Sequence, residues 1–380
     1  MSLPARKSPL LAPFTLVREA TAVDNCELLS LAASCSMRGD ISLRIERQPD
    51  FFALNRLEGL DSRVWVVDAS DRLAGCIATI FRDAYINGQR MRTGYVGDLK
   101  VHPRCRNTVT ADSLCNFAGG QMDQLASGTP TLVTVLAGNR PMEKRLPGPR
   151  GVPAFDWIAT IRSHSIPVLW KRQLNDHSTV KIERARWRDL DQMVRLWSRV
   201  SPSRQFGPIF DSNSLADWIR LAPGLDISSY LVARSCAGEV VGFVALWDQS
   251  SFKQMYVERY SRQMSIVAAL NNIIAPRFGG ARLAAPGEQM RYQTAVHVCV
   301  PGETPEILHS LLIAAHNQLR NTGFAFFNVG LDIVDPLSIA TSGLFGQSTD
   351  IGAYVSTRGS VPLDLDMLRS RPLHYEIALV

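Results

Sequence analysis

The sequence predicts an α+β protein made of two similar domains in tandem. The chain has 380 residues, which is more than one ordinary hydrophobic core accommodates. A strand-turn-helix pattern begins at residues 15–20 and recurs at 180–185, roughly 165 residues later. A hairpin pattern follows in both places, with Gly75 in the first and Gly242 in the second. The matching order and nearly constant offset indicate two copies of one unit.

The first copy opens with an extended run at 15–20, which leads into a helix with apolar periodicity at 28–32. Residues 64–67 and 73–78 are two apolar runs joined by a polar turn. This arrangement is typical of a β-hairpin. The first copy therefore begins as strand, helix and hairpin.

Asn87-Gly88 predicts a tight turn, because this dipeptide accepts the positive φ values of a type I′ turn. It joins the second hairpin strand to a further strand that reaches Val101. Residues 111–125 carry apolar side chains on one face of a 3.6-residue period and predict a helix. A strand at 131–136 and a Pro- and Gly-rich loop at 146–153 follow.

The second copy is expected to repeat this order with a long insertion. Thr304 is the expected N-cap of its main helix, and Pro305 is the first helical residue. The expected elements are a strand at 180–185, a helix at 193–197, a hairpin at 231–234 and 240–245, an insertion at 247–289, a central strand at 293–300, the helix from 304, a strand at 324–329 and a closing strand at 374–380.

These patterns divide the chain into three parts. Residues 1–13 are assigned to an N-terminal tail, 14–172 to the first domain and 173–380 to the second domain. The boundary is placed within 172–179, because this segment is polar and has no hydrophobic periodicity.

Composition and charge exclude several classes of protein. The 41 Lys and Arg residues exceed the 35 Asp and Glu residues, and the net charge of +6 suits anionic ligands. No basic run with interleaved aromatic residues predicts a nucleic-acid partner. The seven cysteines contain no Cys-x-x-Cys pair, which argues against a disulfide framework and a metal site. Because the sequence has no secretory signal and no apolar run of about 20 residues, we expect a cytoplasmic protein without a membrane partner.

Residues 94–111 are the most informative segment of the chain. An extended run ends at Val101-His102-Pro103, Arg104 and Arg106 lie in the turn that follows, and a helix begins after it. Backbone amides at a helix N-terminus, together with arginine side chains, form a cradle for a pyrophosphate. The segment therefore predicts a binding site for a ligand that carries a diphosphate.

This segment resembles the acyl-CoA binding motif of the GCN5-related N-acetyltransferases, the GNAT family. The family motif reads Arg-Gly-x-Gly-x-Gly/Ala after x-Pro-x-x. Pro103, Arg106 and Ala111 match it, whereas Asn107 and Val109 occupy the two internal glycine positions. Those glycines let the backbone approach the pyrophosphate, and Val resists the backbone angles that Gly adopts. Weaker or displaced coenzyme binding is the expected consequence.

The resemblance extends beyond the motif to a tandem subgroup of the family, and it covers most of residues 14–170. It implies two GNAT-like domains, each with a mixed, mostly antiparallel central sheet flanked by helices. The segments that carry this wider similarity are residues 49–54, 85–88, 97–103 and 136–140.

The resemblance also implies a catalytic site that uses acetyl-CoA or coenzyme A. Val101 would direct a backbone N–H at the thioester carbonyl, and Asp98 would accept the ammonium proton. Asp98 alternatively pairs with Arg92, and the general acid is left open among Tyr95, Tyr85 and water. The residues expected to contact the cofactor are Leu99, Val101, Arg104, Arg106, Asn107, Thr108, Val109, Thr110, Ala111 and Asn139.

The turn of the second copy, residues 300–306, is a poorer acyl-CoA site. It contains no arginine, Glu303 and Glu306 would repel a pyrophosphate, and Pro305 removes one backbone N–H. We therefore expect the second domain to be a degenerate GNAT domain that serves as a cleft wall, a dimer surface or a recognition module.

The leading hypothesis is a cytoplasmic N-acetyltransferase that acylates an amine of a small molecule or a peptide by direct attack on the thioester. The alternatives are a non-catalytic acyl-CoA binder and an interaction module in which both clefts have decayed. A homodimer is left open. A further alternative is an aminoacyl or fatty-acyl transferase of tandem type, in which residues 247–289 line the acceptor groove.

Overall fold

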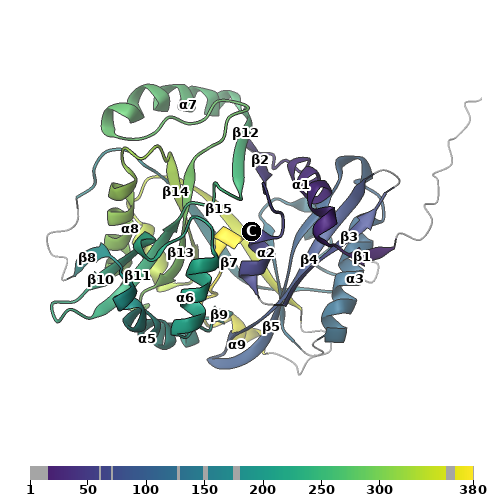
Figure 1. Ribbon diagram of the computed structural model, residues 1–380, viewed down its shortest axis with the longest axis horizontal. Helices are drawn as coiled ribbons and strands as arrows, with labels where there is room; N and C mark the ends of the chain where they lie inside the picture. Colours follow the sequence, from purple (N-terminus) through teal and green to yellow (C-terminus); the bar gives the residue numbers. More distant parts are fainter. Residues whose placement is uncertain are drawn as a thin grey trace, which may run out of the picture.

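A computed structural model of the chain describes residues 16–59, 61–69, 72–125, 129–148, 153–173, 180–356 and 364–379. The predicted tail, part of the predicted loop at 146–153 and most of the predicted boundary segment lie outside these residues. The described strands form one large sheet of 13 strands and a separate two-stranded ribbon. Helices flank the sheet in both halves of the molecule (Figure 1).

The first half of the chain forms the predicted elements in the predicted order. Asn87 and Gly88 have φ values of 53° and 81° and join the two long strands β4 and β5, which confirms the predicted turn. The elements are β1 (Val17–Glu19), α1 (Asn25–Ala33), β2 (Ile41–Glu46), α2 (Ala53–Glu58), β3 (Asp61–Asp68), β4 (Leu73–Ile86), β5 (Gln89–Val101), α3 (Thr110–Leu125), β6 (Thr131–Leu136), α4 (Arg140–Glu143) and β7 (Asp156–Pro167).

The second half repeats this arrangement and adds the predicted insertion. The insertion contains a strand, β12, that pairs with β2 of the first half, and a helix, α7. The elements are β8 (Lys181–Arg184), α5 (Leu190–Val200), β9 (Gly207–Pro208), α6 (Ser212–Leu221), β10 (Tyr230–Arg234), β11 (Val240–Trp247), β12 (Gln254–Tyr260), α7 (Arg262–Ile274), β13 (Tyr292–Cys299), α8 (Pro305–Leu319), β14 (Phe326–Asp332), β15 (Gln347–Ser356) and α9 (Leu365–Arg369).

The two halves exchange strands within the large sheet. Its order is β1-β3-β4-β5-β6-β15-β7-β14-β13-β11-β10-β8. Strand β15, from the second half, pairs with β6 on one side and with β7 on the other, and β7 pairs with β14. Each half therefore completes its sheet with a strand from the other half, which leaves fewer unpaired strand edges. The domain boundary itself stays a prediction.

The period-2 pattern of β3 explains how the first half buries helices on both faces. Val64 and Val66 pack in the cluster that contains Leu28 and Leu31 of α1. Trp65 and Val67 point to the other face and pack with α3. The sheet of the first half is therefore a central layer between α1 and α3.

The expected closing strand at residues 374–380 is wrong. The last strand of the described chain is β15, and Ile377–Leu379 form a short 3-10 turn. The apolar residues of this segment are buried by tertiary contacts, because Tyr375 and Ile377 pack against the first-half core and Ala378 lies in the second-half core. A buried irregular segment can carry the same apolar pattern as a strand.

Both halves bend their central strand at the same point. Asp98 in β5 and His297 in β13 have φ values of 53° and 52°, and the pairing with the preceding strand shifts register at both positions. Each bent strand also pairs in parallel with the next strand over only three positions. Beyond those positions the paired strands separate, so the fold provides a crevice in each half. The shared bulge confirms the internal repeat.

Candidate functional site

A cavity of about 440 Å³ occupies the crevice between β5 and β6 in the first half. Strand β5 pairs with β6 only from Gly94 to Val96, and the cavity is lined by the β5 residues that follow, Gly97 to Lys100. Since the edge of β5 is unpaired there, its backbone groups are available to a ligand. This is the part of the chain in which the sequence places the site.

The end of the cavity on the α3 side of the sheet is mainly apolar, although Asp123, Thr131 and Arg145 also line it. Its lining includes Ala118, Gly119 and Met122 of α3, together with Val133 of β6. The segment that follows β6 closes this end with Met142, Leu146 and Phe155. An apolar slot of this kind suits an extended aliphatic ligand.

The other end of the cavity is polar and lies on the α2 side of the sheet. Asn55 and Glu58 of α2 line it, and the C-terminal segment supplies Tyr375 and Leu379. Ser356 of the exchanged strand β15 lines the other, α3-side end, because it pairs with Thr131 of β6. The cavity therefore reaches both faces of the sheet, and residues from both halves of the chain build it.

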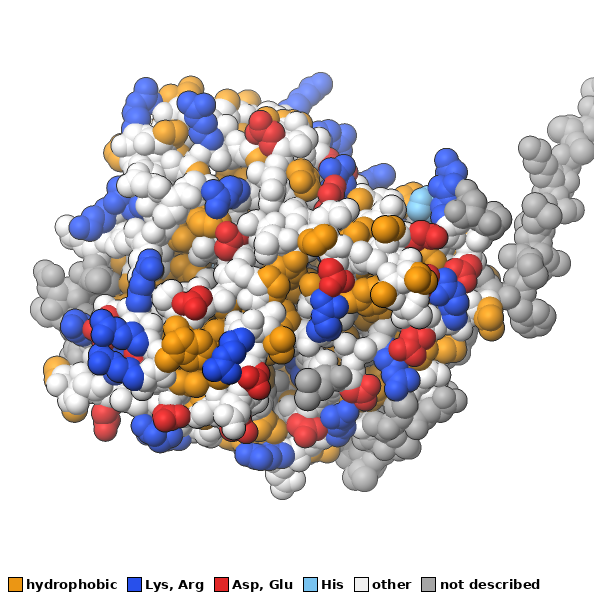
Figure 2. Space-filling model, viewed as in Figure 1, with side chains coloured by type: hydrophobic (Ala, Val, Ile, Leu, Met, Phe, Trp, Pro, Cys, Tyr) orange, Lys and Arg blue, Asp and Glu red, His pale blue; other side chains and the backbone are white. Residues whose placement is uncertain are grey.

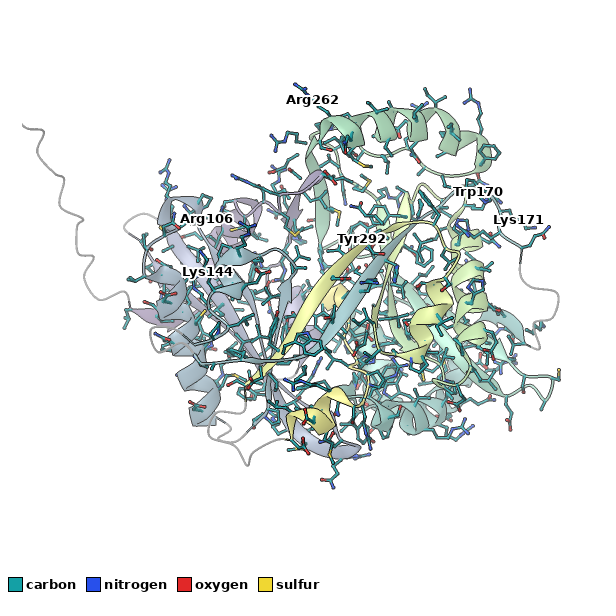
Figure 3. All side chains as sticks on the ribbon, turned by 180° about the vertical axis from the view of Figure 1, so that it is seen from behind. Arg106, Lys144, Trp170, Lys171, Arg262 and Tyr292 are labelled. Atoms are coloured by element: carbon teal, nitrogen blue, oxygen red, sulfur yellow. The ribbon has the colours of Figure 1, made fainter. Side chains whose placement is uncertain are left out.

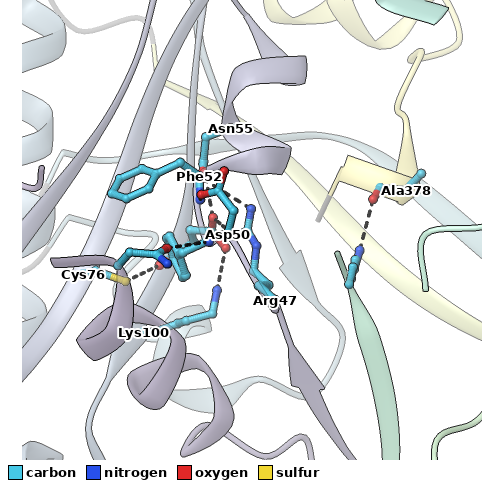
Figure 4. Close-up of polar contacts among 11 residues, drawn as sticks. Arg47, Asp50, Phe52, Asn55, Cys76, Lys100 and Ala378 are labelled. Atoms are coloured by element: carbon cyan, nitrogen blue, oxygen red, sulfur yellow. Dashed lines mark hydrogen bonds and ion pairs between the residues drawn. The ribbon is translucent and has the colours of Figure 1, made fainter. Parts of the chain in front are cut away.

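Asp98 is held in a largely buried network of polar contacts with Arg47, Asn55 and Lys100, which Figure 4 labels. One carboxylate oxygen accepts hydrogen bonds from Arg47, which is 4% exposed, and from Nδ2 of Asn55 at 3.2 Å. The other lies 2.5 Å from Nζ of Lys100. Burial by itself would raise the pKa of Asp98, but the charges of Arg47 and Lys100 outweigh it and hold the pKa well below its usual range. A carboxylate in this state is a weak proton acceptor.

The alternative prediction, that Asp98 pairs with Arg92, is wrong. Arg92 Nη2 donates a hydrogen bond to Asp61 Oδ2 at 3.3 Å, and its Nη1 lies 3.6 Å from Asp83. These contacts are at the opposite end of β5 from the bulge.

Glu58 is a second carboxyl group at the polar end. Its surroundings raise its pKa, whereas the surroundings of Asp98 lower the pKa of that residue. Its Oε2 is buried and has no hydrogen-bond partner among the described residues. Burial and the nearby charge of Asp98 raise the pKa of Glu58 to about 8. Lys253 is also buried, its Nζ donates to the Ala378 carbonyl oxygen at 3.1 Å, and burial together with the charge of Arg47 lowers its pKa to about 7.

Three hydroxyl groups meet beside these carboxyl groups. Thr134 Oγ1 lies 3.0 Å from the Tyr95 hydroxyl and 2.7 Å from the Tyr375 hydroxyl, and the two phenols are 3.3 Å apart. Burial raises the pKa of Tyr95, so its hydroxyl stays protonated at neutral pH. Tyr85, the other tyrosine considered as an acid, pairs with Gly207 near the far end of β4 and does not line the cavity.

The basic turn before α3 is exposed and adopts a conformation suited to an anion. Asn107 has a φ of 65°, which Asn tolerates. Within the described residues, no hydrogen bond is found to the backbone amides of Asn107, Thr108 and Val109. Val109 is 60% exposed, so its side chain does not fill the turn. Figure 3 shows that Arg106 lies in the first half, on the surface of the molecule.

The structure brings together some of the predicted site residues and separates others. Leu99, Asp98 and Asn139 line the cavity. Val101 pairs with Gly75 and lies outside the lining, so its role as an amide donor stays a prediction. The remaining predicted contacts form the adjacent turn and the start of α3, namely Arg104, Arg106, Asn107, Thr108, Val109, Thr110 and Ala111.

Sequence reasoning missed two residues that line the polar end, Glu58 and Tyr375, and two that lie next to it, Arg47 and Lys253. They come from a loop, a short helix, the insertion and the C-terminal segment. No motif spacing connects them, because only the tertiary fold brings them together. The apolar surroundings of Glu58 in the run from Phe51 to Leu60 were the one available signal for a buried carboxyl group.

The equivalent crevice of the second half is filled by side chains. Its cavity measures about 10 Å³. The His297 ring is buried against Trp197, Phe210 and Trp218, with centroid distances of 5.7, 5.3 and 4.4 Å. The C-terminal segment closes the strand gap, where the Leu373 amide donates to Asp332 at 2.8 Å. Among the described residues, this crevice therefore offers far less space for a ligand than the crevice of the first half.

The described part of the chain shows neither a metal cluster nor a bilayer-crossing helix. No group of three or more His, Cys, Asp or Glu residues within it is placed to hold a metal ion. None of its helices combines the length and apolarity that crossing a bilayer requires. All seven cysteines have free thiols.

The splayed central strand, the turn before α3 and the internal repeat define the class of this protein: it has a GNAT fold in tandem form. No family model matches the sequence, and no curated protein matches it. Among solved structures, Saccharomyces cerevisiae N-myristoyltransferase with bound myristoyl-CoA is similar, with a TM-score of 0.61 and 13% identity over 93% of this chain and 85% of that one.

Two further solved structures share the fold. A conserved protein from Enterococcus faecalis V583, described as a probable N-acyltransferase, has a TM-score of 0.50 and 9% identity, over 90% of this chain and 72% of that one. A GCN5-related N-acetyltransferase from Anabaena variabilis has a TM-score of 0.50 and 12% identity, with the same coverage of 90% and 72%. At these identities the comparisons establish the fold.

Proposed function

We propose that this protein is an acyl-CoA-dependent N-acyltransferase whose site lies in the first half. The observation that carries the proposal is the crevice between β5 and β6. It has a basic, amide-rich turn beside it, an apolar slot on one face and a buried unpaired carboxyl group on the other. Similar structures include N-acyltransferases, one of which is crystallised with myristoyl-CoA.

The residues present fit an acyl-CoA in two places. Arg104, Arg106 and the amides of the following turn would hold the diphosphate. The unpaired edge of β5 at Gly97 to Leu99, with Asn139 opposite, would bond the amides of the pantetheine arm. Acyl-CoA supplies an activated thioester carbonyl, which an amine attacks directly.

We assign proton acceptance to Glu58. A general base works best when its pKa lies near the operating pH, and the pKa of Glu58, about 8, lies near that range. The base role that the sequence suggests for Asp98 stays a prediction, and its ion pairs with Arg47 and Lys100 favour a positioning role. The hydroxyl groups of Tyr95 and Tyr375 are the candidate proton donors for the leaving thiolate.

Acetyl-CoA, the donor predicted from the sequence, is the first donor to test. The apolar slot, however, favours a fatty-acyl-CoA as the donor. The slot is lined by Met122, Met142, Leu146 and Phe155, which provide more apolar surface than an acetyl group covers. The acceptor, a small-molecule or peptide amine, would enter at the polar end beside Glu58. A cytoplasmic location and a homodimer stay predictions.

The test is a matrix of acyl donors and amine acceptors. The purified chain is incubated with acyl-CoA thioesters from two to sixteen carbons and with a library of amines and peptides, and released thiol and acylated product are measured. Amide product with at least one donor supports the proposal. Coenzyme A binding by calorimetry without any turnover favours the non-catalytic binder, and absence of binding at millimolar coenzyme A rejects both readings.

A further inference from the structure

Helix α7 of the insertion presents an apolar face to solvent. Ile266, Val267, Leu270, Ile273 and Ile274 are between 46% and 64% exposed. These positions lie within one stripe of the helix surface, and Phe278, 47% exposed in the 3-10 turn that follows, extends it. Isolated exposed apolar residues need no explanation, but six on one stripe indicate a binding surface.

The polar side of the same helix faces the protein. Asn272 exchanges two hydrogen bonds with the backbone of Leu283, at 2.7 and 3.0 Å, and Ala268 and Ala275 are buried beneath the helix. The inner side of the helix is therefore made mainly of small and polar residues, whereas most of its large apolar residues point outward, together with Gln263 and Ser265. This is the reverse of an ordinary surface helix, so the fold itself does not use the apolar stripe.

Within the α7 segment, residues 259–287, every charged side chain is basic, and the acidic residues Asp40 and Glu258 border only its N-terminal end. Arg259, Arg262, Arg277 and Arg282 are basic, and the sequence has no Asp or Glu between Arg259 and Glu288. In Figure 2, hydrophobic atoms run along the upper edge of the molecule, where α7 lies, with Lys or Arg side chains near both ends. Figure 3 shows Arg262 at the same outer edge from behind.

We infer that α7 docks on the surface of an anionic lipid bilayer, with its apolar stripe in the headgroup region and its arginines on lipid phosphates. Helices of this kind lie in the membrane interface when an apolar face and basic residues occur together. The position of α7 at the outermost edge, seen in both ribbon views, lets a flat bilayer reach it. Such contact needs no bilayer-crossing segment. The inference therefore departs from the expectation, drawn above from the sequence, that the protein has no membrane partner.

A second copy of this chain is the less favourable occupant. In a two-fold contact between α7 helices, the patch meets itself, so the arginines at one end would face arginines of the other copy. No acidic side chain within residues 259–287 is available to neutralise them. Anionic phosphates provide the compensating charge that a second copy lacks. The inference does not depend on the proposed function.

Vesicle flotation with the full-length chain tests the inference. Phosphatidylcholine vesicles with and without 30% phosphatidylserine are compared at low and high salt, for the native protein and for a variant with Ile266→Ser, Leu270→Ser and Ile273→Ser. The matched control carries Leu221→Ser, Val334→Ser and Ile339→Ser, three exposed apolar positions elsewhere in the second half. A variant with Arg262→Ala and Arg277→Ala separates charge from apolar contact.

The expected result is salt-sensitive flotation of the native and control proteins with the anionic vesicles. The triple α7 variant should lose at least about 10-fold in partition coefficient, and each arginine removed should cost roughly 5-fold. Three results would overturn the inference: no flotation of the native protein, equal flotation of the α7 variant, or a native dimer that the α7 variant converts to a monomer. Thermal melting of each variant shows that it is folded.

Discussion

The two halves of this molecule have the same β-bulge in their central strands, but they differ in the size of the cavity beside it. Asp98 and His297 occupy equivalent bulges with almost the same φ, and each bulge opens a crevice beside the next strand. In the first half the crevice holds a cavity of about 440 Å³, whereas in the second the cavity measures about 10 Å³. The backbone thus provides the crevice, and the side chains determine whether a ligand can enter it.

The environments of the two bulge residues explain the difference. Asp98 is charged, and Arg47 and Lys100 compensate that charge at the edge of an open space. Burial lowers the pKa of His297 to about 4, so its ring stays neutral among aromatic side chains. A neutral ring can fill a dry crevice, whereas an ion-pair network keeps polar groups at a crevice wall.

The largest expected effect is on catalysis at the open crevice. Glu58→Gln should lower kcat by about 10²- to 10⁴-fold, because the amide cannot accept the amine proton. It should leave the Kd for coenzyme A unchanged, as should the control Glu303→Gln in the second-half turn, which should also retain full activity. Steady-state kinetics and calorimetry measure both quantities. Full activity of Glu58→Gln would remove the assignment of the base.

The pH dependence of the same variant sharpens this prediction. The native rate should rise with pH up to about 8, as Glu58 loses its proton, and this limb should be absent from Glu58→Gln. Because the folded pKa of Glu58 lies above its unfolded value, the native protein binds the proton more tightly and loses stability as the pH rises from about 4.5 to 8. Glu58→Gln should therefore melt at a higher temperature than the native protein at pH 8.

The second largest effect is on stability at the bulge. Asp98→Asn leaves the charge of buried Arg47 uncompensated and should lower the free energy of unfolding by about 3 kcal/mol. Since the folded pKa of Asp98 is lowered, this stabilisation is fully present at neutral pH and declines as the pH falls below about 4. Urea denaturation at pH 7 measures the loss.

A matched substitution controls for the removal of an ion pair. Asp217→Asn breaks an exposed pair with Arg220 and should cost less than about 0.5 kcal/mol. If Asp98→Asn keeps its stability but loses turnover 100-fold or more, the general base is Asp98 rather than Glu58.

A moderate effect is expected at the basic turn. Arg106→Ala should raise the Kd for coenzyme A by roughly 10- to 150-fold, since a charge-assisted hydrogen bond contributes about 1.5–3 kcal/mol. The corresponding change in the second-half turn, Glu303→Ala, should have no effect on that Kd. An unchanged Kd for Arg106→Ala would mean that the guanidinium group is solvated and meets no phosphate.

The smallest effect concerns Val109 in the same turn. Because its side chain is 60% exposed, Val109→Gly removes no core contact and should tighten coenzyme binding by less than about 5-fold, through closer backbone approach. Calorimetry detects a change of this size. Weaker binding by the variant would show that the turn needs the stiffness of valine to hold its conformation.

Much of the fold could be predicted because its signals are local. The Asn87-Gly88 turn, the two hairpins, the helix from Thr110 and the helix from Pro305 each follow from consecutive residues. The closing strand could not be predicted, since residues 374–379 carry a strand-like apolar pattern but are buried as an irregular segment. Among the predicted site residues, the candidate base Asp98, the candidate acid Tyr95, and the predicted cofactor contacts Leu99 and Asn139 line the cavity.

The sequence alone determined the repeat, the central strands and the basic turn, because turn chemistry and hydrophobic periodicity act between near neighbours in the chain. Only the tertiary structure decided that β15 enters the sheet between β6 and β7, and that Glu58 and Tyr375 line one cavity. Pairing and burial between residues hundreds of positions apart depend on which surfaces meet after folding. The pKa of Glu58 likewise depends on surroundings that no local pattern encodes.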